Sequence, residues 1–109
     1  MRTVAFEIEC QVFERDKGYC RYCEADLLRA LSIFRCYTLD HVTSRAMKGS
    51  SIADNLVLCC FGCNNALSRS KHLRTFDERK AKVKLQRRIA SVRYRELRTK
   101  LRNAKVRAI

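Results

Sequence analysis

Two Cys-x-x-Cys pairs constrain the fold of this chain more than any other feature of its sequence. The first pair is Cys20 and Cys23, and the second is Cys60 and Cys63. Each pair places two thiolates on one tight turn, and two such turns supply the four sulfurs that tetrahedral zinc prefers. We therefore expect one structural Zn²⁺ that closes a loop of 36 residues, 24–59.

Other assignments of the cysteines are open at this stage. A redox dithiol is one alternative, but neither pair is flanked by the βαβ pattern typical of such motifs. Cys59 could replace Cys60 by a shift of one residue, although Cys60 keeps the Cys-x-x-Cys spacing. The remaining cysteines, Cys10, Cys36 and Cys59, are expected to be buried small apolar residues.

The length of 109 residues favours one small domain, a size that often recruits a metal or a partner. Glu7 and Glu9 lie where a secretory signal would be apolar. No stretch approaches the roughly 18 apolar residues of a membrane span. We therefore expect an intracellular, cytoplasmic protein, in the host cytoplasm if it is viral, and no membrane partner.

Positive charge is concentrated in the last third of the chain. The formal net charge is +13, and residues 71–109 hold 15 of the 24 Lys and Arg but only 3 of the 11 acids, a net +12. Dense cationic segments of this kind often bind nucleic acid. The pattern predicts a domain over residues 1–74 and a basic helical extension over residues 75–109.

Local patterns predict a mixed α+β fold. Apolar spacing predicts an N-terminal helix up to Arg15, broken at Asp16-Lys17-Gly18. Thr75 and Glu78 match a capping box, which predicts the start of a long helix that runs to about residue 106. Between them we expect a short helix or turn at 25–34, a strand at 36–42, a loop at 43–54, a strand at 55–59 and a helix at 64–72.

Three stretches, RDKGYCRYCE, TLDHV and DNLVLCCFGCN, together resemble the HNH endonuclease family, or ββα-metal nucleases, in its zinc-knuckle-containing branch. The resemblance spans roughly residues 15–67. It implies a ββα-metal core stapled by a four-cysteine zinc site, here with an N-terminal helix and a long basic C-terminal helix. It also implies a metal-dependent DNA endonuclease whose cut leaves a 3′ hydroxyl.

The resemblance assigns roles to four polar residues enclosed by, or next to, the cysteine pairs. His41 is the expected general base, a role that suits a side chain with a reference pKa near 6.5. Asp40 and Asn64 are the expected ligands of a catalytic divalent cation, Mg²⁺, Mn²⁺ or another. Asn55 is expected to hold the loop so that His41 is aimed. Because neighbours in a strand point to opposite faces, the strand must end or twist at 40–41.

The expected partner is DNA, most simply double-stranded. Candidate phosphate-binding side chains are Arg45, Lys48, Lys71, His72, Arg87, Arg88 and Arg95. Apolar residues of the extension, Leu85, Ile89, Val92, Leu97 and Leu101, are expected to pack on the core or on a second copy of the chain, which would make a homodimer. The alternatives are a non-catalytic zinc-ribbon nucleic-acid-binding module, a basic helix lying on a membrane, and an assembly protein.

Overall fold

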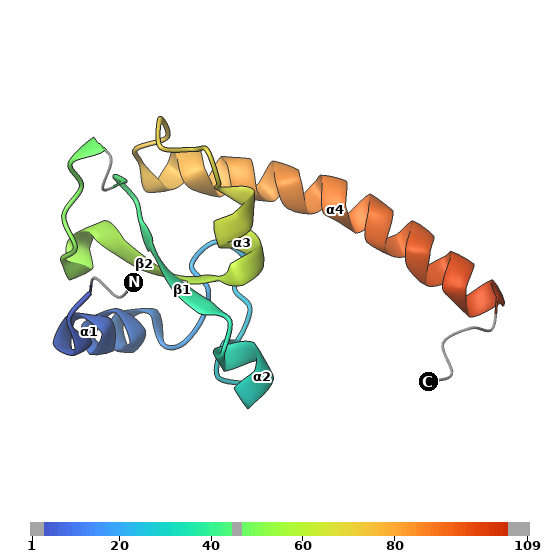
Figure 1. The fold of residues 1–109 in the computed structure, drawn as a ribbon, viewed down its shortest axis with the longest axis horizontal. Helices are drawn as coiled ribbons and strands as arrows, with labels where there is room; N and C mark the ends of the chain where they lie inside the picture. Colours follow the sequence, from blue (N-terminus) through green and yellow to red (C-terminus); the bar gives the residue numbers. More distant parts are fainter. Residues whose placement is uncertain (1–3, 45–46, 105–109) are drawn as a thin grey trace.

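The computed structural model describes residues 4–44 and 47–104 of the chain. Helices surround a small two-stranded sheet, so the α+β prediction is confirmed (Figure 1). In chain order the elements are α1 (Phe6–Asp16), α2 (Leu31–Phe34), β1 (Tyr37–His41), the 3-10 turn η2 (Ala53–Asn55), β2 (Leu56–Cys60), α3 (Phe61–Ala66) and α4 (Phe76–Ala104). No helix in the described ranges has the length and apolar character required to cross a membrane.

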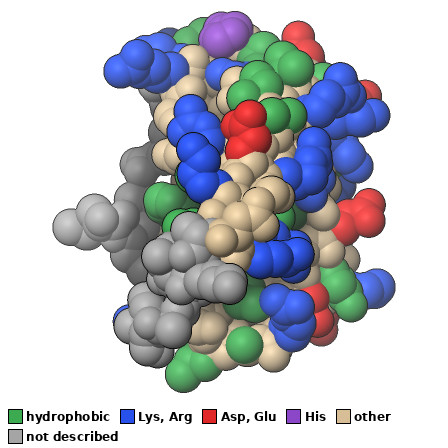
Figure 2. Space-filling view, turned by 90° about the vertical axis from the view of Figure 1, so that its right-hand side faces the viewer, with side chains coloured by type: hydrophobic (Ala, Val, Ile, Leu, Met, Phe, Trp, Pro, Cys, Tyr) green, Lys and Arg blue, Asp and Glu red, His purple; other side chains and the backbone are tan. Residues whose placement is uncertain are grey.

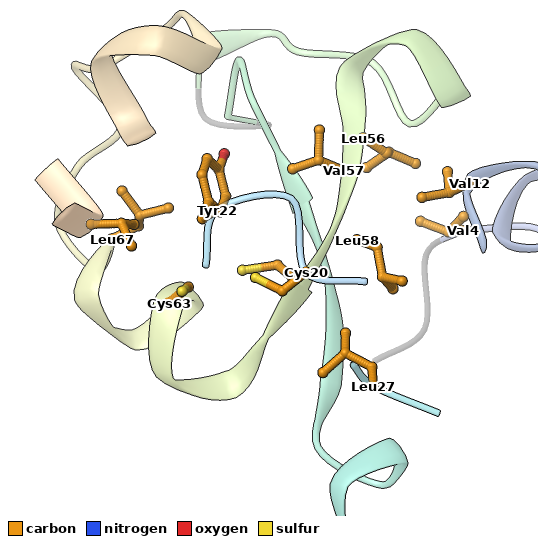
Figure 3. Packing of buried hydrophobic residues seen from close by; sticks show 12 residues of the cluster. Val4, Val12, Cys20, Tyr22, Leu27, Leu56, Val57, Leu58, Cys63 and Leu67 are labelled. Atoms are coloured by element: carbon orange, nitrogen blue, oxygen red, sulfur yellow. The ribbon is translucent and has the colours of Figure 1, made fainter. Parts of the chain in front are cut away.

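The two strands and the long loop between them are present as the sequence predicts, and the strands pair as an antiparallel hairpin. Asp40 pairs with Val57, and His41 pairs with Leu56. Every residue of β2 up to Cys59 is buried, which fits the apolar character of this strand. Figure 3 shows Leu56 and Leu58 on the side of Val4 and Val12, while Tyr22 and Leu67 lie on the other side.

Helix α1 ends where the sequence predicts. Its last residue, Asp16, is hydrogen-bonded to α1, to the first cysteine pair and to β2. Lys17 and Gly18 take positive φ angles of 56° and 79°, which turns the chain into the first cysteine pair. The buried Asp16 carboxylate accepts hydrogen bonds from Arg15, from Arg21 and from the backbone N–H of Leu58. Burial raises the pKa of Asp16, but these hydrogen bonds outweigh burial and lower it below its usual value.

The predicted helix at 64–72 is wrong in its boundaries, because α3 spans Phe61–Ala66. The helix begins inside the second cysteine pair, since the sulfur of Cys60 accepts a hydrogen bond from the N–H of Cys63 and so caps the first turn. Residues 67–75 form turns instead, and Arg69 takes a positive φ of 62°. The cysteine turn and the helix start are therefore one unit.

The capping box before α4 is confirmed in both directions. Thr75 accepts a hydrogen bond from the N–H of Glu78, and the Glu78 carboxylate accepts one from the N–H of Thr75. The first turns of α4 belong to the core, because the ring of Phe76 stacks on Tyr22 and Val83 is fully buried. Beyond these turns α4 projects away from the other elements (Figure 1). The predicted end near residue 106 lies outside the described residues.

Candidate metal centre and nucleic-acid cleft

The four cysteines of the two Cys-x-x-Cys pairs meet at one point. The Sγ atoms of Cys20, Cys23, Cys60 and Cys63 all lie within 4.8 Å of one another. Contact with Cys20 raises the pKa of Cys60, but hydrogen bonds with Cys23 and Cys63 outweigh it and lower the pKa to about 6. A thiolate is the form that binds metal. Four sulfurs in this arrangement could hold a tetrahedral zinc ion.

The other three cysteines lie outside this cluster. Cys59 is fully buried, as expected, and its thiol donates to the carbonyl of Cys60. The expectation of burial is wrong for Cys10 and Cys36, which are both exposed. Cys10 is two residues before Val12 on α1, a turn of about 200° that places the two side chains on opposite sides of the helix.

A cleft of about 650 Å³ opens where β1, α3 and the start of α4 meet. It brings together three of the four predicted polar residues, Asp40, His41 and Asn64, from positions up to 24 apart in the sequence. The lining residues are Leu39, Asp40, His41, Ser44, Asn64, Leu67, Arg69, Ser70, Lys71, His72 and Arg79. Among these, Asp40 is the sole acid, so cations dominate the cleft.

Asp40 is buried and is held by two residues that the sequence interpretation did not connect to it. Arg79 of α4 donates from Nε and Nη2 to the two carboxylate oxygens, at 3.0 and 2.8 Å. The Tyr22 hydroxyl donates to Oδ2 at 2.6 Å. Burial and the charge of Asp40 raise the pKa of Tyr22 well above its usual range, so its proton stays in place to donate.

All three nitrogen atoms of the Arg79 guanidinium donate hydrogen bonds. Besides Asp40, its Nη1 atom donates to the carbonyls of Ser70 and Leu73, at 3.2 and 3.0 Å. Burial lowers the pKa of Arg79, but hydrogen bonding to Asp40 and the charge of that carboxylate outweigh it and raise the pKa above its ordinary value. The guanidinium therefore joins β1, the turn after α3 and the first turn of α4.

His41 is the last residue of β1, so the predicted end of the strand at 40–41 is confirmed. Its Nε2 atom lies 3.0 Å from the hydroxyl of Ser51, which is in the long loop of the hairpin. The ring is half-buried and borders the cleft. A histidine fixed in orientation at the edge of a cationic cleft has the geometry for proton transfer to or from a bound group.

Asn55 binds both ends of that loop rather than lining the cleft. Its side-chain oxygen accepts from the N–H of Thr43 at 2.8 Å, and its Nδ2 atom donates to the carbonyls of Thr43 and Ser50 at 2.9 and 2.8 Å. Gly49 packs against the same point, since a Cβ atom there would lie 1.7 Å from the Thr43 carbonyl oxygen and 2.9 Å from Asn55 Nδ2. The loop next to His41 is thereby closed on itself.

The donor set of the cleft fits a hard divalent cation in its chemistry. Asp40 and Asn64 both line the cleft, and carboxylate and amide oxygens are ligands that suit Mg²⁺ and Mn²⁺. A carboxylate has about four acceptor positions, and Asp40 uses three of them for Arg79 and Tyr22. A cation at Asp40 would therefore share the carboxylate with Arg79 or displace it.

The predicted phosphate-binding residues fall into three groups. Lys71 and His72 line the cleft and are exposed, and Lys48 is exposed on the hairpin loop. Arg45 lies outside the described residues. Arg87, Arg88 and Arg95 are exposed on α4, well away from the cleft. The prediction missed Arg69 and Arg79 at the cleft, because no local pattern distinguishes them from other cations.

Cations and exposed apolar side chains share the projecting part of α4. The view from the side on which α4 ends shows Lys and Arg side chains dominating over acidic ones (Figure 2). Packing of the apolar residues on the core does not occur, because each is at least 40% exposed. Contact with a second copy stays a prediction. The residues concerned are Leu85, Ile89, Val92, Leu97 and Leu101.

Comparison with known proteins agrees with this geometry. The model of the HNH endonuclease family matches residues 20–70, a range that contains both cysteine pairs, the hairpin and α3. It also contains Asp40, His41, Asn55 and Asn64. No curated protein and no solved structure matches the chain.

Proposed function

Because residues 20–70 belong to the HNH endonuclease family, we propose that this chain is a metal-dependent DNA endonuclease. The observation that carries the proposal is the meeting of Asp40, His41 and Asn64 at one cationic cleft within the matched range. The proposed substrate is double-stranded DNA, whose phosphates the cations of the cleft attract.

His41 is proposed to take a proton from the attacking water, which then forms the new bond to phosphorus. The bond from phosphorus to the 3′ oxygen breaks, and the departing oxygen takes up a proton to give the 3′ hydroxyl. The contact between His41 and Ser51 supports this role, because it fixes the ring. Asn55 supports the role of His41 indirectly, because its hydrogen bonds to Thr43 and Ser50 hold the loop that carries Ser51.

Asp40 and Asn64 are the proposed ligands of the catalytic cation, Mg²⁺ or Mn²⁺. When bound, such a cation stabilises charge that develops on the phosphate oxygens. Lys71, His72 and Arg69 are proposed to attract and position the phosphodiester at the cleft. The four-cysteine cluster is proposed to hold zinc as a structural ion that fixes the hairpin and α3 together.

A non-catalytic nucleic-acid-binding module is the second candidate function. One observation favours it: the charge of Asp40 is already paired with Arg79, and the Tyr22 hydroxyl occupies a further acceptor position of the carboxylate. In that case the cleft would bind a phosphate group without hydrolysing it, and the zinc cluster would serve a binding domain.

Cleavage of supercoiled plasmid separates the two candidates. The zinc-loaded protein is incubated with plasmid in the presence of Mg²⁺, of Mn²⁺ and of no added metal, beside a His41→Ala variant. The proposal predicts metal-dependent relaxation that falls by about 10²- to 10⁴-fold in the variant, the usual contribution of a general base. A wild-type protein that binds plasmid but leaves it intact under every metal would establish the binding module instead.

A further inference from the structure

The cations of α4 are not distributed evenly around the helix. At about 100° per residue, seven of them fall within a sector of roughly 100° between residues 80 and 102. Ser91 is the one other residue in that sector, so it contains no acid. All seven side chains are exposed: Lys80, Lys84, Arg87, Arg88, Arg95, Arg98 and Arg102. We call this set the cationic ridge.

The ridge is separate from the side of α4 that packs on the core. Arg79 and Val83, which are buried, lie about a quarter to a third of a turn around the helix from the centre of the ridge. Lys82, Arg93 and Lys100 form a smaller group on the opposite side, near Glu96. The helix therefore has one continuous cationic face and one face on which cations lie near an acid.

The ridge also has a direction relative to the cleft. Along the helix axis it begins at Lys80, which follows the cleft-lining Arg79 and is turned from it by about 100° around the helix. It ends at Arg102, which is 22 residues further along the helix, or about 33 Å at 1.5 Å per residue. At 3.4 Å per base pair, this length corresponds to about ten base pairs of B-form DNA.

We infer that the cationic ridge of α4 is a backbone-binding surface that holds duplex DNA on one side of the cleft over about one helical turn. The inference rests on the nucleic-acid substrate of the proposed function, but it does not require hydrolysis. Charge confined to one sector fits a row of phosphates along one side of α4. A helix inserted into the major groove would instead contact the walls of the groove on both flanks.

The test compares two double variants with the same change in charge on the same helix. Arg95→Gln/Arg98→Gln removes two cations from the ridge, and Arg93→Gln/Lys100→Gln removes two from the opposite side. Binding to a labelled 24-base-pair duplex is measured by fluorescence anisotropy at several salt concentrations, without added Mg²⁺ or Mn²⁺. Zinc content and circular dichroism verify that both variants fold like the wild type.

Each phosphate contact contributes about −0.9 to the slope of log K against log salt concentration. The ridge variant is therefore expected to reduce the magnitude of the slope by about 1.8, while the opposite-side variant keeps the wild-type slope. Equal slopes for the two variants, whether both reduced or both unchanged, would overturn the inference. Because no cation for hydrolysis is present, the result is independent of plasmid cleavage.

Discussion

The ion pair between Arg79 and Asp40 predicts a large and specific loss of stability in the Arg79→Ala variant. Both side chains are almost fully buried, at 5% and 6% exposure. Removal of the guanidinium leaves the carboxylate buried with the Tyr22 hydroxyl as its remaining partner in the described structure. Breaking a buried pair from one side costs about 3–5 kcal/mol, because an uncompensated charge stays in the interior.

A loss of this size is a substantial part of the stability of a small domain, which is about 5–15 kcal/mol. With a urea dependence of about 2 kcal/mol per molar, the unfolding midpoint is expected to fall by about 2 M. The assay is urea unfolding followed by circular dichroism at a fixed zinc concentration, since a bound metal also contributes to stability. Lys84→Ala, on an exposed position of the same helix, is expected to change stability by less than about 0.5 kcal/mol.

The double variant Asp40→Leu/Arg79→Met tests whether the uncompensated charge causes the loss of stability. It removes both charges and leaves apolar side chains of similar size, so part of the lost stability is expected to return. The Tyr22 hydroxyl loses its acceptor and the carbonyls of Ser70 and Leu73 lose their donor, which keeps a residual cost of at least about 1–3 kcal/mol. A midpoint for Arg79→Ala within about 0.5 M of the wild type, or a double variant no more stable than the single, would contradict the account.

Two further predictions concern the cysteine cluster and the Asp16 carboxylate. Cys60→Ser is expected to lower zinc content and unfold the domain, whereas Cys59→Ser is expected to retain zinc, as measured by metal analysis and circular dichroism, because only Cys60 belongs to the cluster. The pKa of Asp16 is lowered by folding, so its stabilising contribution is present above the unfolded pKa of about 3.9 and is lost as the pH falls through the folded value. The difference in urea midpoint between the wild type and Asp16→Asn is therefore expected to be largest above about pH 5 and to shrink below about pH 4; a constant difference would contradict this assignment.

Features determined by local sequence were predictable in this chain. The strands follow from apolar and β-branched runs, and the start of α4 follows from the reciprocal hydrogen bonds of Thr75 and Glu78. The meeting of the four cysteines follows from the geometry of two Cys-x-x-Cys turns. The interactions that determine the strands and the start of α4 join residues close in sequence. The four cysteines meet because all of them are ligands suited to one zinc ion.

Features determined by packing between distant segments were not predictable. The exposure of Cys10 and Cys36, where burial was expected, depends on how the segments that carry these cysteines pack against the rest of the domain. The start of α3 at Phe61 depends on Cys60 acting as a helix cap while its sulfur also belongs to the cluster. The spacing of the cysteines does not reveal that one sulfur has both roles.

The partner of Asp40 is the most consequential of these unpredicted features, because it joins the matched domain to the helix that follows it. Arg79 is 39 residues from Asp40 and lies beyond the matched range of 20–70. If a divalent cation binds Asp40 as proposed, it competes with the guanidinium for the same oxygens or shares them. Cation binding and the seating of the first turn of α4 are then thermodynamically linked, and each affects the other by the same free energy. Because α4 also carries the cationic ridge, a cation bound at Asp40 would then affect both the cleft and the orientation of this helix through one carboxylate.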